Sequence, residues 1–316
     1  MQPASIVKLW GTLPEVQVFY CDITNAGDQF NVDLFAHYGY RAIWAPPETA
    51  EVVGVGSILG HVPAHCQAAI MGGGFMSAEW GNTFVRSTVH AVRGQYNRKM
   101  ICRRVPVLGD PGLLASLMYA REKTRYALGI VPHYVDLEDP LLEKLARLES
   151  GAVQVIDIRQ SPAEVIRRIT ECETIASSSL HGLVFADSFA IPSVWMPMSD
   201  KVSGNGFKFV DYFSVFNESP RPLARAEAKS VSFICKNARC RPLDRLEETR
   251  TRLDETFKRL GEIVEGVRAR RTNRVLEAAV IAWNRIGVNR TEEGALSEAA
   301  RRASRSAIPR ILRWLP

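Results

Sequence analysis

Short apolar runs alternate with helix-forming stretches along most of this chain, and each run ends in a polar turn, often one that contains glycine. This alternation is typical of βα units, in which parallel strands are buried beneath crossover helices. We therefore predict an α/β fold. Its expected strands cover residues 16–21, 52–55, 68–72, 89–92, 105–108, 127–131, 153–158, 174–176 and 193–196, and its expected helices include residues 30–38, 96–103, 140–148 and 162–171.

The βα units fall into two successive sets that meet near residue 120. We predict two Rossmann-like domains, residues 1–120 and 121–240, whose carboxyl strand ends face a cleft. Residues 241–316 are rich in Arg and Glu and are expected to form a helical, basic extension with helices over 245–271 and 274–286.

Composition excludes several classes of protein. The chain has 316 residues, 46% of them hydrophobic, but no apolar stretch approaches the ~20 residues of a transmembrane helix. The N-terminus lacks the pattern of a secretory signal, so we expect a cytoplasmic protein. Its six cysteines match no zinc motif and are expected to be reduced thiols. The net charge of +6 alone leaves nucleic acid, anionic small molecules and acidic membranes open as partners.

The segment Ser179-Leu180-His181-Gly182 follows the strand at 174–176 and opens a helix. In open α/β sheets, ligands bind at the carboxyl ends of strands, and a helix N-terminus there attracts anions. A histidine at this place can contact an anionic ligand and also transfer a proton. His181 is therefore the leading candidate for a catalytic residue.

Other polar residues also follow predicted strands. Asn25 and Asp28 either cap a helix or point into the crevice as a hydrogen-bond acceptor or base. Arg93 either binds a carboxylate or phosphate or forms a surface ion pair. His133, Lys201 and Lys208 are placed near the His181 crevice in the same way. The candidate residues for ligand binding are Arg93, Lys201, Lys208, Ser179, Asn25 and His133.

Familiar nucleophile and metal motifs are missing. The sequence has no Walker A lysine motif, no G-x-S-x-G elbow and no H-E-x-x-H helix. The glycines at 54, 56 and 60 do not have the spacing of a dinucleotide-binding loop. Together with Gly72-Gly73-Gly74 they indicate turns where the backbone approaches a ligand or packs tightly.

Taken in order, these motifs resemble the polysaccharide pyruvyltransferase family, and in particular the ketal pyruvyltransferases of succinoglycan-type exopolysaccharide assembly. The resemblance covers roughly residues 16–216. It rests on Asn25-Ala26-Gly27-Asp28, the glycine-rich turns at 56 and 72, Val92-Arg93-Gly94, Leu108-Gly109-Asp110-Pro111, Ile130-Val131-Pro132-His133, Ser179-Leu180-His181-Gly182, Ile191-Pro192 and Lys208-Phe209 before Asp211-Tyr212.

The resemblance implies a fold like that of GT-B glycosyltransferases, phosphoenolpyruvate as the donor substrate, a pair of sugar hydroxyls as the acceptor, no cofactor and no required metal. Many family members have an arginine two residues before the histidine, where this chain has Ser179. Lys201 matches the family's lysine by its distance from the histidine, and Lys208 by its local context. We expect His181 to be the acid, Arg93 and Lys201 to hold the donor anion, and Asp28 to be the base for the acceptor hydroxyl.

Two rival functions remain open from the sequence: a GT-B glycosyltransferase that uses a nucleotide sugar, and a non-catalytic partner in polysaccharide assembly. A lipid-linked acceptor would bring the protein to the inner membrane, and nucleic acid is not an expected partner. The basic segment 301–316 has two readings, either peripheral binding to anionic lipid or packing across both domains.

Overall fold

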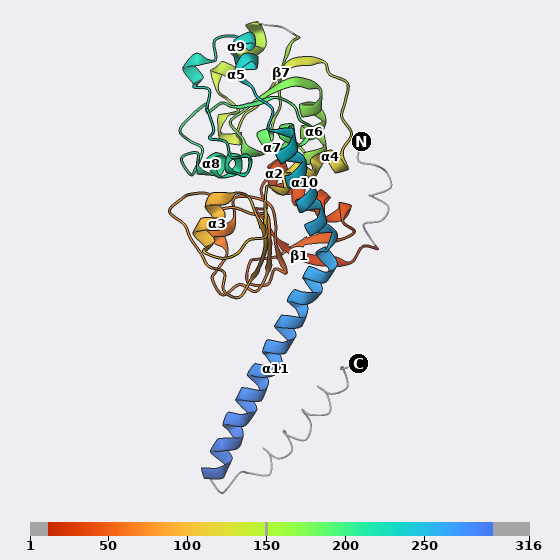
Figure 1. Cartoon of the computed structure of the whole chain (residues 1–316), viewed down its shortest axis with the longest axis vertical. Coiled ribbons are helices and arrows are strands. Elements are labelled where there is room, and N and C mark those ends of the chain that lie inside the picture. Colours follow the sequence, from red (N-terminus) through yellow and green to blue (C-terminus); the bar gives the residue numbers. More distant parts are fainter. Residues whose placement is uncertain (1–11, 149–150, 293–316) are drawn as a thin grey trace. The chain divides into compact units, whose positions relative to one another are not determined.

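All strands of the first sheet run parallel in the computed structural model, which describes residues 12–148 and 151–292 (Figure 1). The strand order is β2-β1-β3-β4-β5-β6. The strands are β1 (Glu15–Phe19), β2 (Arg41–Trp44), β3 (Val52–Val53), β4 (Ala69–Met71), β5 (Thr88–Val92) and β6 (Val107–Leu108). Strand β2 was not among the predicted strands, because it is an edge strand whose Arg41 and Trp44 are exposed.

The second sheet has the order β10-β9-β7-β8 and is also parallel. Its strands are β7 (Tyr126–Val131), β8 (Val153–Val155), β9 (Cys172–Ser177) and β10 (Ser193–Trp195). Strand β9 lies between β10 and β7, so its apolar residues Ile175 and Ala176 are fully buried. The mixed α/β fold with parallel sheets is therefore confirmed, whereas the GT-B-like arrangement stays a prediction.

Several of the helices pack into one hydrophobic core that includes strands of both sheets, whereas the others pack into two further clusters. On α2 Phe30 packs against Phe185 of α7 with ring centroids 5.3 Å apart, and the backbone N–H of Ala26 donates to the carbonyl of Ile158. The helices are α2 (Ala26–His37), α3 (Gln95–Ile101), α4 (Ala115–Met118), α5 (Pro140–Leu148), α6 (Pro162–Thr170), α7 (Leu180–Ser188), α8 (Phe207–Phe213) and α9 (Val231–Asn237). Both sheets belong to one compact unit, residues 1–267, and the domain boundaries at 120 and 240 stay predictions.

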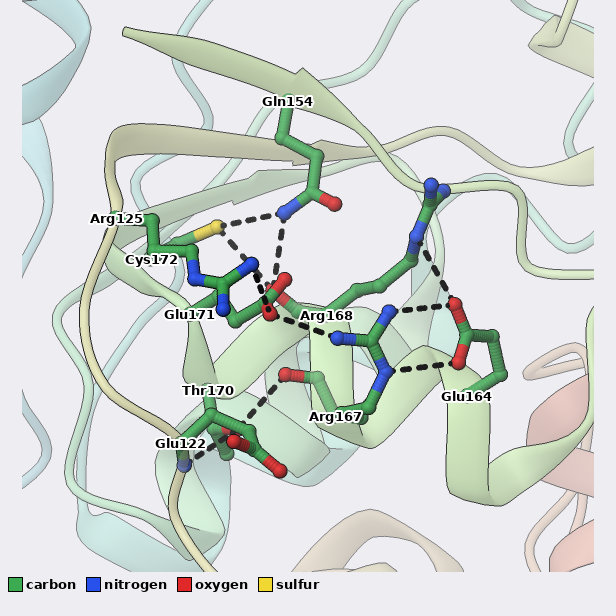
Figure 2. Close-up of polar contacts among 9 residues, drawn as sticks. All are labelled: Glu122, Arg125, Gln154, Glu164, Arg167, Arg168, Thr170, Glu171 and Cys172. Atoms are coloured by element: carbon green, nitrogen blue, oxygen red, sulfur yellow. Dashed lines mark hydrogen bonds and ion pairs between the residues drawn. The ribbon is translucent and has the colours of Figure 1, made fainter. Parts of the chain in front are cut away.

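Helix α6 shows how sequence signals fix a local structure. Ser161 caps it by accepting the N–H of Glu164 at 3.3 Å, and Pro162 occupies its first turn. Figure 2 shows Arg167 joining Glu164 to Glu171, with nitrogen–oxygen distances of 2.7–2.9 Å. Because Glu171 directly precedes β9, this network ties α6 to the start of the strand that leads to His181.

The C-terminal helices are α10 (Leu243–Lys258) and α11 (Leu260–Glu292). Helix α10 returns to the first sheet, where Phe257 packs on Phe35 and Asp254 accepts a 2.8 Å hydrogen bond from Tyr38. The predicted break at residues 272–273 is wrong: the break falls at Arg259, where Gly261 packs so close to the Tyr40 hydroxyl that a Cβ would lie 2.5 Å from it.

A second unit begins at Arg268, and its described residues, up to Glu292, are part of α11. Within the described residues, no helix is both long and apolar enough to span a bilayer. The basic segment 301–316, to which the membrane prediction applies, lies outside the described residues.

Candidate active site

A pocket of about 410 Å³ opens at the carboxyl ends of strands from both sheets. Its walls come from the turns after β1, β3 and β7, from the end of β2, and from the N-terminal part of α7 and α8. The predicted site residues that line it are Asn25, Asp28, His133, Ser179, His181 and Lys208. The structure therefore brings together in one pocket six of the residues that the sequence placed at separate strand ends.

His181 is the second residue of α7 and is only 8% exposed. Two glycines make its position possible. A Cβ at Gly27 would lie 1.9 Å from Nδ1 of the imidazole, and a Cβ at Gly182 would lie 2.3 Å from the Ser177 hydroxyl oxygen. The start of α2 can therefore pack on the ring, and the start of α7 on the end of β9, only because both positions lack a side chain.

The serines before His181 fix the turn between β9 and α7. The Ser177 hydroxyl accepts the N–H of Ser179 at 3.0 Å. The Ser178 hydroxyl accepts the N–H of His133 at 2.8 Å and donates to Asp136 at 2.7 Å, which joins this turn to the turn after β7. Ser179 is the N-cap residue of α7, but its side chain makes no capping hydrogen bond. Without that cap, the helix N-terminus faces the pocket as a site for an anion.

Asp110 is the closest charged partner of His181. Its Oδ1 lies 3.8 Å from Nε2 of the imidazole and also accepts the N–H of Gly112 at 2.9 Å. Nε2 is buried and has no hydrogen-bond partner among the described residues. Burial lowers the pKa of His181, and Asp110 opposes this effect. The ring is thus neutral in the free protein and can take up a proton when negative charge enters the pocket.

Asp28 and Lys208 form a second titratable pair. Burial raises the pKa of Asp28 to about 7, although the positive charge of Lys208 acts in the opposite direction. Burial also lowers the pKa of Lys208 to about 8, although Asp28 opposes this. Both groups titrate near neutral pH, which is the range in which a side chain exchanges protons most effectively.

Asn25 and His133 line the pocket and also hold local turns in place. Asn25 caps α2 by accepting the N–H of Gly27 at 2.9 Å. It therefore acts as a helix cap and lies at the pocket at the same time. His133 precedes a short 3₁₀ turn and its Nδ1 accepts the N–H of Val135. Burial, with help from Lys208, lowers the pKa of His133 to about 4. His133 is therefore uncharged at neutral pH and can offer a hydrogen bond but no cation.

Arg93 does not line the pocket. It is 1% exposed, and its guanidinium donates to Asp211 (3.1 Å), to the Ser57 hydroxyl (2.7 Å) and to the carbonyl of Phe75 (2.5 Å). The glycine-rich turn makes room for it, since a Cβ at Gly74 would lie 2.4 Å from the guanidinium carbon. This geometry does not favour a direct hold on a donor anion, because the guanidinium is buried away from the pocket lining and three of its five N–H groups are used within the protein.

The two candidate lysines are placed differently. Lys208 is 6% exposed and lines the pocket, whereas Lys201 is exposed and does not. Lys201 instead lies near Asp139, whose pKa is lowered mainly by a hydrogen bond from Arg225 and to a smaller degree by the charge of Lys201. Lys208, which matches the family's lysine by its local context, therefore lies at the pocket, whereas Lys201, which matches by distance from the histidine, does not.

Two residues of this site were not among the predicted site residues. Asp110 sits in the turn Gly109-Asp110-Pro111-Gly112, which contributed to the family resemblance but supplied no predicted site residue; its position directly after a strand was the available signal. Asp211 binds Arg93 and the backbone N–H of Asn97 (2.9 Å), and it lies one helical turn after Lys208 in α8. Arg93 therefore anchors the helix that carries Lys208.

No group of three or more His, Cys, Asp or Glu side chains suited to a metal ion occurs in the part of the chain that the structure describes. The fold and the pocket together define an α/β protein that can hold a small anion beside two proton-transferring side chains.

Comparison with known proteins shows what this chain is similar to. Residues 74–200, about two fifths of the chain, match the model of the polysaccharide pyruvyl transferase family, the family that its motifs resemble. The succinoglycan biosynthesis protein ExoV of Rhizobium meliloti is 28% identical over 232 residues, which cover 68% of this chain and 69% of ExoV.

Two other proteins are similar over part of their length. An uncharacterized protein of Acanthamoeba polyphaga mimivirus is 33% identical over 158 residues; these cover 47% of this chain, which spans about half (53%) of that relative. The crystal structure of an uncharacterized protein from Klebsiella pneumoniae covers 70% of this chain and 95% of its own, with 14% identity and a TM-score of 0.38.

Proposed function

We propose that this protein transfers a pyruvyl group from phosphoenolpyruvate to a sugar of an exopolysaccharide repeat unit, with a lipid-linked unit as the acceptor. The product is a cyclic pyruvate ketal, and phosphate is released. The observation that carries the proposal is the grouping of a buried lysine and an uncapped helix N-terminus with His181 and Asp28 in one pocket. The family match and the similarity to ExoV support the same activity.

The donor carries a carboxylate and a phosphate, so its site must supply positive charge. Lys208 supplies a full charge, and the first turn of α7 supplies backbone N–H groups and a partial positive charge. Ser179, which stands where relatives have an arginine, contributes a hydroxyl at the same helix end. In this proposal Lys208 takes over the charge that the missing arginine provides elsewhere.

His181 acts as the general acid. Binding of the anionic donor raises the pKa of the imidazole, because a negative charge favours its protonated form, and Asp110 stabilises that form from the other side. Protonation of the methylene carbon of phosphoenolpyruvate turns it into a methyl group and leaves an oxocarbenium-like C2. The phosphate oxygen on C2 shares this positive charge until a nucleophile arrives.

Asp28 acts as the base for the acceptor. A first sugar hydroxyl attacks C2 and gives its proton to Asp28, the C2–O bond to phosphate then breaks, and the second hydroxyl attacks the same carbon. Of the two hydroxyl protons, one replaces the proton that entered the methyl group and the other leaves with phosphate, so atoms and charges balance. A carboxyl with a pKa of about 7 can both accept and return protons near neutral pH.

The deciding experiment incubates the protein with phosphoenolpyruvate and a lipid-linked oligosaccharide and measures phosphate release. We expect release that requires the acceptor, together with a pyruvylated product in the mass spectrum. Lack of acceptor-dependent release together with binding of a nucleotide sugar would instead favour a glycosyltransferase. Lack of both would favour a non-catalytic partner in polysaccharide assembly.

A variant pair tests the role of the acid. His181→Ala should lower kcat by about 10²–10⁴-fold, the usual contribution of a general acid, while the protein stays folded. His65→Ala is the matched control, because His65 is exposed and does not line the pocket. Near-normal turnover of His181→Ala would refute the assignment.

A further inference from the structure

The mouth of the pocket carries exposed aromatic side chains that the proposed donor chemistry does not use. Trp44 is 47% exposed and Tyr134 is 44% exposed, and both line the pocket. Trp44 ends β2 of the first sheet, and Tyr134 follows β7 of the second. Large exposed apolar side chains that gather at one pocket indicate a binding surface, whereas scattered ones need no explanation.

Both rings are held in fixed orientations. The indole Nε1 of Trp44 donates a 3.0 Å hydrogen bond to the carbonyl of Tyr20. Since this is the only donor on the indole, Trp44 offers a ligand its apolar ring surface and nothing else. The Tyr134 ring lies over the His133 imidazole with centroids 4.3 Å apart and keeps its hydroxyl for a polar partner. Rings fixed in this way lose little conformational entropy when a ligand binds.

The pocket lining is of two chemical kinds. Asp28, His181 and Lys208 supply titratable groups, whereas Trp44 and Tyr134, together with Ile23 and Met76, supply apolar surface. Phosphoenolpyruvate is a small polyanion and gains nothing from an aromatic surface. A pyranose ring has an apolar C–H face that packs against the electron-rich face of an aromatic ring, and hydroxyls around its edge. A volume of about 410 Å³ leaves room for such a ring beside a three-carbon donor.

We propose that Trp44 and Tyr134 form the acceptor subsite: the sugar ring stacks on the indole of Trp44, and Tyr134 contacts its edge from the other sheet. This inference rests on the proposed function, because it assigns the acceptor of the same reaction. It explains why an edge strand ends in an exposed tryptophan whose N–H bond to Tyr20 holds it at the pocket.

Steady-state kinetics in which the acceptor and phosphoenolpyruvate are varied separately test the subsite. Trp44→Ala and Tyr134→Ala should each raise the KM for the acceptor by about 10-fold or more and leave the KM for phosphoenolpyruvate within about 2-fold. Trp44→Phe keeps a ring and should stay close to the wild type. Phe233→Ala is the control, because Phe233 is also an exposed aromatic residue but lies on α9 outside the pocket. An unchanged acceptor KM in Trp44→Ala would overturn the inference.

Binding without the donor separates this inference from the proposed function. Saturation-transfer NMR with methyl glucoside, galactoside and mannoside should detect binding of at least one sugar to the wild type and to Phe233→Ala, but not to Trp44→Ala. The inference is wrong if the wild type binds none of them, or if Trp44→Ala binds as the wild type does. Failure of phosphoenolpyruvate turnover beside intact, Trp44-dependent sugar binding would instead count against pyruvyl transfer alone.

Discussion

The imidazole of His181 packs directly against the backbone of Gly27, so that a Cβ at residue 27 would lie 1.9 Å from Nδ1. The first turn of α2 and the first turn of α7 therefore meet with no space for a side chain. This contact sets how far His181 can move from Asp110, and it joins the turn after β1 to the turn after β9. The position of the proposed acid thus depends on a residue with no functional group.

Gly27→Ala should push the His181 ring out of place and lower kcat by about 10²-fold or more, since small displacements of a catalytic group have effects of this size. The fold should remain, because alanine is favourable within a helix. Gly81→Ala is the matched control: its Cβ meets nothing closer than the carbonyl oxygen of Met100 at 3.6 Å. Circular dichroism and steady-state kinetics give the comparison, and full activity of Gly27→Ala would show that His181 needs no such contact.

The fold was predictable where local signals decide it. Helix α5 was predicted with its observed bounds, and the other strands of both sheets lie at or within a few residues of the predicted runs. Strand β2 was missed because half of its side chains are exposed, and the break between the two C-terminal helices was placed too late in the chain. Hydrophobic periodicity indicates which face of an element is buried. It marks neither an exposed edge strand nor a break between two successive helices.

The site was predictable only in part for a similar reason. Residues at strand ends could be placed, because parallel strands carry their carboxyl ends to one edge. Which of them pair with one another could not. Arg93 and Asp211 are 118 positions apart in the chain, and neither residue's neighbours indicate that the two are buried together. An arginine at a strand end therefore looks like an anion ligand until its partner is known.

Asp28 should destabilise the folded protein above about pH 4. A carboxyl titrates near 4 in the unfolded chain, whereas its pKa in the fold is about 7. The folded state thus binds the proton more tightly, and its stability falls as pH rises from about 4 to about 7. Asp28→Asn removes this penalty and should raise the free energy of unfolding at pH 8 by about 1–3 kcal/mol, with no gain below pH 4.

Denaturant unfolding at the two pH values measures this difference. Asp22→Asn is the control, because Asp22 lines the same pocket but is exposed. The Asn variant should also lose transfer activity, as expected for a site where stability is exchanged for function. A variant that is no more stable than the wild type at pH 8 would argue against a buried, destabilising carboxyl.

Lys208, and not Lys201, should hold the donor. Lys208→Gln removes the charge that faces the pocket and should weaken phosphoenolpyruvate binding by about 10-fold or more, as expected for a lost charge-assisted contact. Lys201→Gln should have less than about a 2-fold effect. Because the pKa of Lys208 is about 8, wild-type affinity for the donor should fall as pH rises above 8, whereas the Gln variant should lack this decline.

Calorimetric titration of phosphoenolpyruvate between pH 7 and pH 9 tests both statements. If Lys201→Gln lost affinity and Lys208→Gln kept it, the match by sequence distance would be the correct one, and Lys201 would have to reach the pocket in the bound state.

The Arg93–Asp211 pair should act on the donor through Lys208. Arg93→Ala leaves the Asp211 carboxylate buried without its cation, which costs about 3–5 kcal/mol and should lower Tm by roughly 10 °C. Arg93→Lys should not restore the wild-type Tm, since one ammonium cannot reach Asp211, Ser57 and the Phe75 carbonyl together. Asp211→Asn, which keeps the shape of the side chain, is the milder second variant.

Thermal unfolding and donor affinity, measured on the same samples, separate the two possible roles of Arg93. If Arg93 only positions α8, Arg93→Ala and Asp211→Asn should both lose stability, and their donor affinity should fall in the same order. A wild-type Tm combined with a 10-fold loss of donor affinity in Arg93→Ala alone would mean that the guanidinium reaches the phosphate or carboxylate directly. Asp211 would then be its orienting partner, and the charge missing at Ser179 would be supplied by Arg93.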